Sequence, residues 1–425
     1  MLHLNRRKVL KSAAAAGLGA MVPGALLWPI RAMAKEAEPL PVAGVITEYR
    51  TASHADVILG KILEGYRQDG GPGPGLKLVS VFTDQFAAKD LCRPLAQKYG
   101  FRLASSIDDA VTLGTNEVQV AGVLSVGEHG IYPYTPDTKQ HMYPRKRFFD
   151  EIVATFRRCG KAVPVFNDKH LSYRWDEALA MYETARAMNF PFLAGSSVPL
   201  AWRQPVLDLP LGCEIEAAVG VGYGGLEAYG YHALEALQSL IERRRGGETG
   251  VSSVQAVQGD GIQQAEHDGR WSRELFEAAL KVLPGAPKDN DTWRNNPNSA
   301  AYLVEHRDGL KSATLIAEGL ASQFAAAVKL KGRPEPLATL FALQPGPPYG
   351  HFAYLVDAFE QTIRTGRAVS PVERTLLTTG VLDRAMHSLA ESHQRFETPE
   401  LNVAYQPGDW PFANHPKSHL ILPNN

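Results

Sequence analysis

Apolar segments alternate with segments of helical spacing throughout the first half of this 425-residue chain. The β-prone run from Pro41 to Thr47 precedes residues 53–66, where apolar side chains recur three and four positions apart and Ser53 is the expected helix cap. The alternation continues to about residue 200 and predicts a Rossmann-like α/β domain over residues 40–200, with a parallel sheet and right-handed crossovers. Further strands are expected at 76–83, 118–126, 162–166 and 191–194, and further helices at 87–99, 147–159 and 175–188.

The pattern changes after about residue 201. β-prone runs follow one another with hairpin signals such as Asp308-Gly309 between them. These residues predict a second α/β domain over 201–405 with an open, mostly antiparallel sheet, followed by a tail at 406–425. Strands are expected at 211–221, 251–259, 302–307, 311–316 and 337–343, and helices at 226–243, 352–365 and 374–392.

The first 34 residues have the features of an export signal. Arg6-Arg7 precedes a mildly apolar run, and Ala32-Met33-Ala34 has the small-x-small pattern of a cleavage site. Three glycines and two prolines interrupt the apolar run at 12–29, which argues against a stable membrane span. We therefore predict export by the twin-arginine route and a periplasmic location, with a retained N-terminal anchor as the alternative.

Composition narrows the classes of partner. With 44% apolar residues, a chain of this length can bury two cores. The formal charge of −1, from 44 basic and 45 acidic side chains, gives no field that favours nucleic acid or an anionic membrane, so a small molecule is the expected partner. Cys92, Cys159 and Cys213 have no paired spacing and predict neither a disulfide framework nor a metal site.

Chemically active side chains gather where predicted strands end. The buried run that begins at Ala162 stops at Asp168-Lys169-His170, at the carboxyl edge where parallel sheets bind ligands. These residues offer an acceptor, a cation and a group that titrates near neutral pH, although Asp168 could instead cap the next helix. The strand ending at Val126 leads into Gly127, His129 and a long loop to about residue 145, which indicates either a substrate-facing loop or a packed surface excursion.

The loop after the first strand lacks the glycines that a dinucleotide usually needs. In G-x-G-x-x-G the bare backbone lets the pyrophosphate approach a helix N-terminus, whereas Thr47 and Tyr49 carry side chains there. Arg50 and the helix N-terminus could still attract a phosphate. Asp84, at the end of the next strand, is placed to hold ribose hydroxyls or to cap a helix.

Most of the chain, about residues 41–405, resembles the Gfo/Idh/MocA group, which includes glucose-fructose oxidoreductase and inositol dehydrogenase. Asp168-Lys169-His170 is similar to the family's Glu-Lys-Pro and keeps the lysine. Gly224-Gly-Leu-Glu-Ala-Tyr-Gly-Tyr-His232 resembles the family's Gly-Gly-x-Leu-x-Asp-x-Gly-x-His, although Ala228 replaces the acidic residue. The glycine fingerprint is also lost, so the chain resembles a divergent member.

The resemblance implies an oxidoreductase that acts on a sugar, polyol or glycoside with a tightly held NAD or NADP. It implies that His232 takes the substrate's hydroxyl proton while Lys169 stabilises the developing alkoxide, with His170 as a further catalytic candidate. It also suggests self-association through the second sheet. The cofactor-binding candidates are Thr47, Tyr49, Arg50, Asp84, Gly127 and Asp168, and the substrate-binding candidates are His129, Trp202, Arg203 and Tyr229.

The residues alone are compatible with two other functions. The same scaffold could act on a carbohydrate without a dinucleotide, as a lyase or hydrolase, because His129, His170 and Glu128 supply further acid–base groups. Alternatively, the chain could be a non-catalytic sugar-binding protein in which aromatic side chains such as Tyr229 stack on the sugar, and His232 could then be a satisfied buried histidine.

Overall fold

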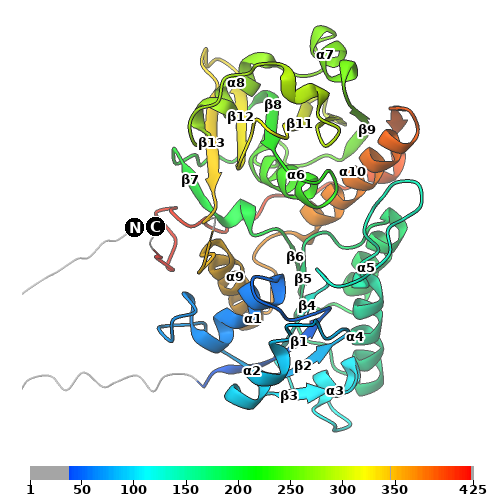
Figure 1. The fold of residues 1–425 in the computed structure, drawn as a ribbon, viewed down its shortest axis with the longest axis vertical. Helices are drawn as coiled ribbons and strands as arrows, with labels where there is room; N and C mark the ends of the chain where they lie inside the picture. Colours follow the sequence, from blue (N-terminus) through cyan, green and yellow to red (C-terminus); the bar gives the residue numbers. More distant parts are fainter. Residues whose placement is uncertain (1–37, 345, 423–425) are drawn as a thin grey trace, which may run out of the picture. The chain divides into compact units, whose positions relative to one another are not determined.

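A computed structural model describes residues 38–344 and 346–422, and residues 39–422 lie within one compact unit (Figure 1). The twin-arginine segment predicted at residues 1–34 falls outside the described residues. No helix in the described part of the chain is both long and apolar enough to cross a bilayer.

The first sheet has six parallel strands in the order β3-β2-β1-β4-β5-β6, as predicted for the Rossmann-like half. Its strands are apolar on both faces because helices cover both sides. The strands are β1 Leu40–Ile46, β2 Leu76–Thr83, β3 Arg102–Ala104, β4 Gly122–Val126, β5 Val165–Asp168 and β6 Phe192–Gly195. The helices between them are α1 His54–Glu64, α2 Cys92–Tyr99, α3 Ile107–Thr112, α4 Arg145–Cys159 and α5 Trp175–Ala187.

One helix from late in the chain completes this first layer. Helix α9 (His351–Thr365) packs beside α1, and Phe359 lies 6.0 Å from the Phe166 ring on β5. Phe359 and Leu355 share a buried cluster with apolar residues of β1, β2 and β4. The predicted boundary between residues 200 and 201 therefore separates the strands of the two sheets. It does not separate the helices, because α9 follows the boundary in sequence and still covers the first sheet.

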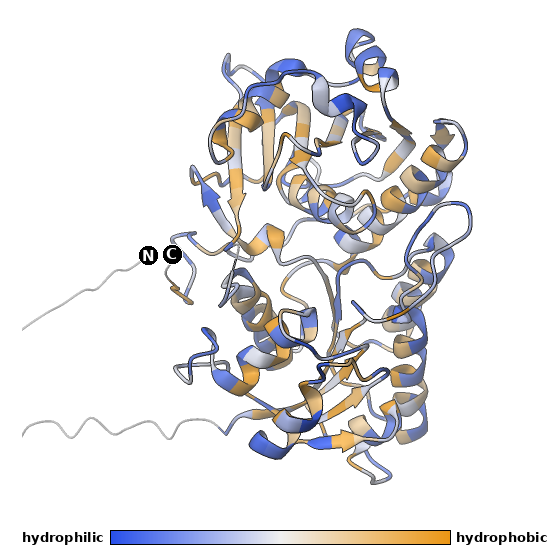
Figure 2. Cartoon of the chain, viewed as in Figure 1, coloured by the Kyte–Doolittle hydropathy of each residue, from blue (hydrophilic) through white to orange (hydrophobic). Residues whose placement is uncertain are grey.

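The second sheet has eight strands in the order β14-β9-β10-β11-β8-β12-β13-β7. Only β8 and β11 pair in parallel, so the prediction of a mostly antiparallel sheet is confirmed. Figure 2 shows that the ribbons of the longer strands are largely hydrophobic, whereas the short edge strand β7 is hydrophilic. The strands are β7 Trp202–Gln204, β8 Ile215–Gly222, β9 Val251–Val257, β10 Ala300–His306, β11 Lys311–Ile316, β12 Phe324–Leu330, β13 Leu337–Ala342 and β14 Phe396–Glu397.

Helices lie on both faces of the second sheet. Gly220 of β8 faces α6 (Ala228–Ile241), where an added Cβ would lie 3.1 Å from Leu237 Cβ. The neighbouring Val219 packs in a separate cluster with Phe276 of α8 (Arg273–Val282). Helix α8 therefore covers part of the face through which self-association was predicted, and oligomerisation stays a prediction. The remaining helices of this half are α7 Asp260–His267 and α10 Val372–Ala390, with short 3₁₀ turns at Val198–Leu200, Thr292–Asn295 and Pro399–Leu401.

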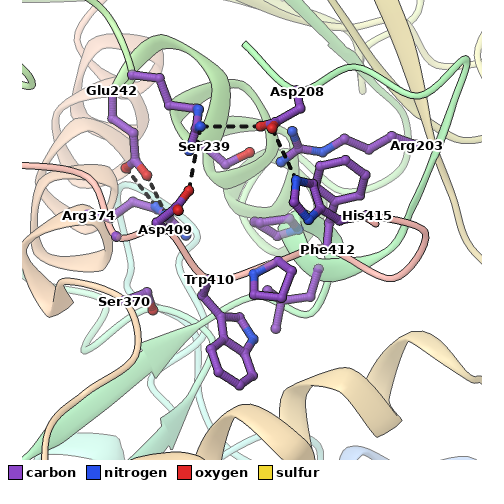
Figure 3. Close-up of a pocket in the computed structure, with 15 residues that line it drawn as sticks. Arg203, Asp208, Ser239, Glu242, Ser370, Arg374, Asp409, Trp410, Phe412 and His415 are labelled. Atoms are coloured by element: carbon purple, nitrogen blue, oxygen red, sulfur yellow. Dashed lines mark hydrogen bonds and ion pairs between the residues drawn. The ribbon is translucent and has the colours of Figure 1, made fainter. Parts of the chain in front are cut away.

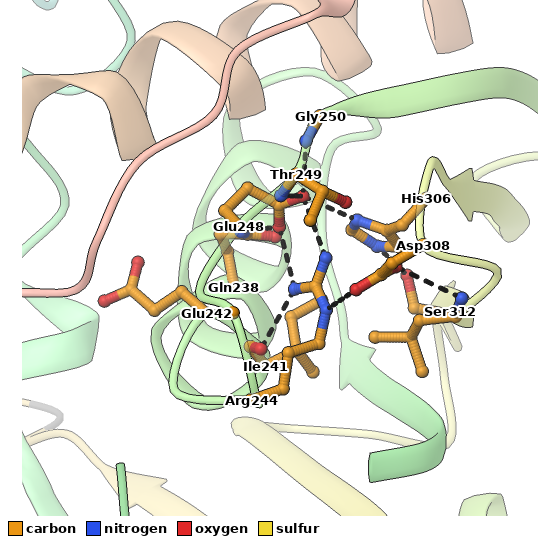
Figure 4. A network of polar contacts seen from close by, with 12 residues as sticks. Gln238, Ile241, Glu242, Arg244, Glu248, Thr249, Gly250, His306, Asp308 and Ser312 are labelled. Carbon is orange, nitrogen blue, oxygen red and sulfur yellow. Dashed lines mark hydrogen bonds and ion pairs between the residues drawn. The ribbon is translucent and has the colours of Figure 1, made fainter. Parts of the chain in front are cut away.

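A buried polar network joins α6 to the far end of the second sheet (Figure 4). Glu248 accepts hydrogen bonds from both Nη1 and Nη2 of Arg244, each at 3.0 Å, and lies 3.1 Å from Nδ1 of His306. Burial opposes ionisation of Glu248, but His306 and Arg244 outweigh it and hold the pKa of this carboxyl far below its ordinary value. The network is therefore a structural anchor rather than a site with a free charge.

Glu248→Gln is expected to lower the free energy of unfolding by about 2–4 kcal/mol at neutral pH, because Arg244 loses its buried counter-charge. A carboxyl whose folded pKa is depressed contributes stability above its unfolded pKa of about 4.3, and that contribution is lost as the pH falls. Unfolding in guanidinium chloride should thus show that the difference in free energy of unfolding between wild type and Glu248→Gln shrinks from pH ~7 to pH ~3. An equal difference at both values would contradict this assignment.

Candidate functional site

Lys169 and His232 line one cavity of about 330 Å³ at the carboxyl edge of the first sheet. Lys169 directly follows β5, and His232 projects from the first half of α6. We call this space the Lys169–His232 cavity. It is also lined by Ala52, His54, Val57, Glu128, His129, Ser197, Val198, Tyr223, Ala228, Tyr229, Phe324, Leu343, Gln344, Tyr349, His351 and Phe352.

The backbone around this cavity is strained. Lys169 (φ +65°), His129 (φ +71°), Ala52 (φ +58°) and Tyr349 (φ +50°) line the cavity in a conformation that favours glycine. Strain of this kind persists only where the surroundings impose it, and it concentrates at binding sites. Lys169 is held by a hydrogen bond from its amide to the carbonyl of Gly195, 3.1 Å away.

Lys169 belongs to a buried cluster of alternating charges. Its Nζ lies 3.0 Å from Oε1 of Glu128, and Arg145 donates to Oε2 of Glu128 at 2.6 Å. All three residues are buried, and burial alone would raise the pKa of Glu128, but the charges of Lys169 and Arg145 outweigh it and keep this pKa well below its ordinary value. The cluster therefore presents an oriented ammonium group beside an ionised carboxylate.

Gly127 is required by the packing of Arg145. A Cβ at position 127 would lie 2.7 Å from Cγ of Arg145, whose guanidinium is already held by Glu128. Gly127→Ala is therefore expected to lower the free energy of unfolding by about 1–3 kcal/mol, because the arginine must leave its rotamer. Gly225→Ala is the matched control, since an added Cβ there meets no atom within 4 Å. Equal unfolding midpoints in urea for the two variants would refute this role for Gly127.

The imidazole of His232 is poised as a neutral base. Its Nδ1 lies 2.6 Å from Oγ of Ser196, and that oxygen also accepts a hydrogen bond from the amide of Val198. Burial, followed by the charges of Lys169 and His54, keeps the pKa of His232 well below its ordinary value. In the tautomer whose Nδ1 carries the hydrogen and donates to Oγ of Ser196, the neutral imidazole can accept a proton at Nε2.

Two more histidines enter the cavity from the first half of the chain. Nδ1 of His54 lies 2.6 Å from Oδ2 of Asp168, a buried carboxylate that orients the ring. Nδ1 of His129 accepts a hydrogen bond of 3.4 Å from the amide of His54. Burial and the neighbouring His54 lower the pKa of His129 to about 4, so this ring is neutral near pH 7. Asp168 was predicted to contact a cofactor, and in the structure it holds His54.

His170 has no free nitrogen with which to act as a base. Its Nε2 accepts from Nη1 of Arg145 at 2.9 Å, so Nδ1 carries the hydrogen and donates to the carbonyl of Ser172 at 2.8 Å. Burial and the charge of Arg145 lower its pKa well below the ordinary value. His170 therefore holds Arg145 in position. These contacts give no support to the predicted catalytic role of His170.

The predicted substrate residues separate into two groups. His129 and Tyr229 line the Lys169–His232 cavity, whereas Trp202 and Arg203 do not. Trp202 packs in the core against Tyr354, with ring centroids 5.4 Å apart. Arg203 lies in a separate, small pocket of about 40 Å³ over the ring of Phe412 (Figure 3). The family resemblance implied that both residues contact the substrate, but β7 pairs with β13 at the sheet edge and neither residue lines the Lys169–His232 cavity.

The N-terminus of α1, where this fold class places a pyrophosphate, is occupied by protein groups. The amide of His54 donates to Nδ1 of His129, and the amide of Asp56 donates to Oγ of the cap residue Ser53 at 3.3 Å. The amide of Ala52, just before the helix, donates to Oδ2 of Asp56 at 2.8 Å. Tyr49 is fully buried in the core, and Arg50 turns to Glu48 at 2.6 Å. The loop thus offers no bare backbone to a diphosphate, and Arg50 already has a carboxylate partner.

The ribose position at the end of β2 is also filled. Oδ1 of Asp84 pairs with Arg147 and Oδ2 accepts from the hydroxyl of Tyr132, at 2.6 and 2.7 Å. Gln85 exchanges two hydrogen bonds with the backbone of Ile131, at 2.9 and 3.0 Å. The long loop after β4 therefore lies across the end of β2, and the described residues do not fit a dinucleotide in its usual pose.

Sequence reasoning missed several residues of this site. His54 and Ser196 lack a distinctive spacing, and Arg145 was read only as the end of a loop. Their partners, Asp168, His232 and Glu128, lie 114, 36 and 17 positions away along the chain. No group of three or more metal-ligating side chains with suitable geometry occurs within residues 38–344 and 346–422.

Comparisons with protein-family models and with curated proteins gave no match. Solved structures do match. GenD2 from gentamicin A biosynthesis, in complex with NAD, is 13% identical, with 85% of this chain and 97% of that chain covered and a TM-score of 0.55. The scyllo-inositol dehydrogenase of Lactobacillus casei is 10% identical, with 85% and 98% covered and a TM-score of 0.53. The myo-inositol dehydrogenase of Corynebacterium glutamicum is 14% identical, with 84% and 98% covered and a TM-score of 0.52.

At such identities the comparisons establish architecture and leave the chemistry of this chain to its own residues. The three proteins bind NAD or are inositol dehydrogenases, and nearly their whole length aligns with this chain. The chain therefore has the two-part α/β fold found in Gfo/Idh/MocA-type dehydrogenases.

Proposed function

We propose that this protein is an enzyme that acts on a carbohydrate or polyol by proton transfer in the Lys169–His232 cavity, without a bound dinucleotide. The observation that carries the proposal is the joint lining of one cavity by Lys169 and His232, while His129 and Tyr132 take up the positions expected for the pyrophosphate and one ribose of a dinucleotide. The reaction class is removal of a proton from the substrate, as in a lyase.

The roles follow from the geometry. His232, neutral and fixed through Nδ1 near Ser196, accepts the proton at its other nitrogen. Lys169 stabilises the negative charge that develops on the neighbouring oxygen, and Glu128 keeps the ammonium group in place. Because both the amine and the imidazole are buried or half-buried, water screens their interaction with the substrate little.

The proposal is tested by proton NMR in D₂O with a panel of ketoses, uronic acids and methyl glycosides. Wild type should incorporate deuterium at carbon or release methanol from at least one compound, and His232→Gln should lose about 10²–10⁴-fold of that rate. Glu183→Gln, an exposed change on α5, is the matched control and should keep the wild-type rate. A rate in His232→Gln equal to wild type, or no reaction with any compound in wild type, would refute the proposal.

A second candidate is a sugar or polyol dehydrogenase with tightly held NAD or NADP, and the fold shared with an NAD-bound structure favours it. Absorbance and mass spectra of the purified full chain distinguish the two. We expect no bound nucleotide in wild type. His129→Gly keeps the positive φ but removes the ring from the N-terminus of α1, so it should gain affinity for NADH by about tenfold. A nucleotide that co-purifies with wild type would favour the dehydrogenase.

We further propose that the protein is exported by the twin-arginine route and acts in the periplasm. The support is the Arg6-Arg7 segment and the Ala32-Met33-Ala34 pattern. Expression of the full chain in a bacterium with this route should yield a periplasmic form that begins at about residue 35, as read by mass spectrometry. Arg6→Lys with Arg7→Lys should retain the protein in the cytoplasm, and continued export of this variant would exclude the twin-arginine route.

A further inference from the structure

A second cavity of about 530 Å³ adjoins the first. Glu128 and Ala228 line both, so a ligand in the Lys169–His232 cavity lies beside the second space. We call the second space the Glu227 cavity. Its other lining residues combine aromatic, neutral polar and apolar groups, among them Tyr134, His141, Tyr143, Gln258, Asn298 and Leu389.

The aromatic side of the Glu227 cavity is a stack that a sugar ring can extend. His141 lies between two tyrosines, with ring centroids 4.3 Å from Tyr134 and 3.9 Å from Tyr143. Tyr134 is 58% exposed, so the protein leaves more than half of the surface of this outer ring uncovered. Sugar rings bind such faces through their C–H groups, while amides such as Asn298 and Gln258 suit their hydroxyls.

Glu227 has one satisfied and one unsatisfied carboxyl oxygen. Oε2 accepts a hydrogen bond of 2.7 Å from the amide of His141. Oε1 is shielded from solvent and has no hydrogen-bond partner in the described part of the chain. Its neighbour Nε2 of His170, 4.0 Å away, already accepts from Arg145 and cannot take a proton from Glu227. A hydrogen on this oxygen therefore has no acceptor among the described residues.

The surroundings favour the neutral acid. Burial raises the pKa of Glu227 to about 7, and the charge of Glu128 adds to this, whereas the amide of His141 and the charges of Arg145 and Lys169 oppose it. The hydroxyl of Tyr302, which packs nearby, donates to the carbonyl of Leu226 at 2.7 Å and so does not stabilise the carboxylate. Below neutral pH the side chain can donate a hydrogen bond, and above it the group becomes an acceptor only.

We propose that the Glu227 cavity binds a second sugar ring, so that the substrate is a two-ring carbohydrate, and that the carboxyl of Glu227 hydrogen-bonds to an oxygen of that ring. The inference rests on the proposed function for the substrate class, and it adds a subsite that the Lys169–His232 cavity does not contain. A one-ring ligand bound beside His232 would leave the larger space empty, whereas a two-ring ligand uses both.

Calorimetric titration of the full chain with glucose, galactose, maltose, cellobiose and lactose tests the subsite. At about pH 5.5, the best disaccharide should bind wild type at least about tenfold more tightly than its one-ring component. At about pH 8.5 this ratio should fall to about 1–3, because the ionised Glu227 no longer donates. Glu227→Gln should keep the ratio at both pH values, since its amide still donates, and Glu227→Ala should lose it at both.

Glu183→Gln is the matched control on an exposed helix position and should behave as wild type. A ratio near one in wild type at both pH values, or an unchanged ratio in Glu227→Ala, would overturn the inference. If Glu227→Ala fails to fold, the pH dependence of wild type and its absence in Glu227→Gln decide the question. A disaccharide that binds with the expected affinity ratio but shows no deuterium exchange would count against the proposed function alone, because the affinity ratio is read independently of turnover.

Discussion

Lys169→Met should reduce turnover by about 10³-fold, the largest effect on activity that we expect of any single change outside His232. Among the described residues that line the cavity, Lys169 alone is a lysine or arginine, and its ammonium lies 3.0 Å from Glu128. Methionine fills a similar volume but brings no charge, and Arg145 still compensates Glu128, so folding should be retained. Deuterium incorporation at carbon, followed by proton NMR, measures the loss.

The control for this change is Lys77→Met, which removes an exposed lysine from β2 and should leave the rate unchanged. Lys169→Arg is informative as well, because the guanidinium is planar and longer than the ammonium and should restore less than about a tenth of the rate. A Lys169→Met protein that keeps the wild-type rate while its unfolding free energy drops would mean that Lys169 serves the fold only.

Arg145→Met should lower the free energy of unfolding by about 3–5 kcal/mol, the largest stability effect expected in this region. The guanidinium is 1% exposed and donates both to Glu128 at 2.6 Å and to His170 at 2.9 Å. Its loss leaves one buried carboxylate with half of its counter-charge and one buried imidazole nitrogen without a donor. Unfolding in guanidinium chloride at neutral pH measures this difference in the free energy of unfolding directly.

Arg157→Met provides the comparison, because Arg157 lies on the same helix, is exposed and has no side-chain hydrogen bond or ion pair with residues 38–344 or 346–422. Its change should stay within about 0.5 kcal/mol of wild type. If the two variants unfold at the same denaturant concentration, the buried charge cluster does not support the fold as described here.

The order of strands and helices was readable from the sequence where hydrophobic periodicity is strong. The predicted strand at 76–83 has those bounds in the structure, and the helix beginning at Trp175 starts there. Short or alanine-rich elements were missed, among them β3, α3 and β12, whose sequence Phe-Ala-Ala-Ala-Val-Lys-Leu carries little β-prone signal. The covering helix α8 was missed with them, and so the second sheet was expected to have a bare face.

For the site, strand ends pointed to Lys169 and His129, and the resemblance of residues 224–232 to a family motif pointed to His232 and Tyr229. It could not assign their partners. Whether Asp84 is free for a ribose depends on Tyr132 and Arg147, and whether His170 is free to act depends on Arg145, all of which reach their places through the fold. Each of these pairings joins residues 25 to 63 positions apart.

The sequence by itself determined the alternation of elements, the two kinds of sheet and the strand end that carries Lys169, since these follow from local periodicity and propensity. The tertiary structure alone decided that the loop after β4 closes the usual dinucleotide position, that Lys169 and His232 share a cavity, and that Glu227 keeps an unpartnered oxygen. The physical reason is that burial and charge pairing are set by neighbours distant in the chain, and these terms determine which polar groups stay free to react.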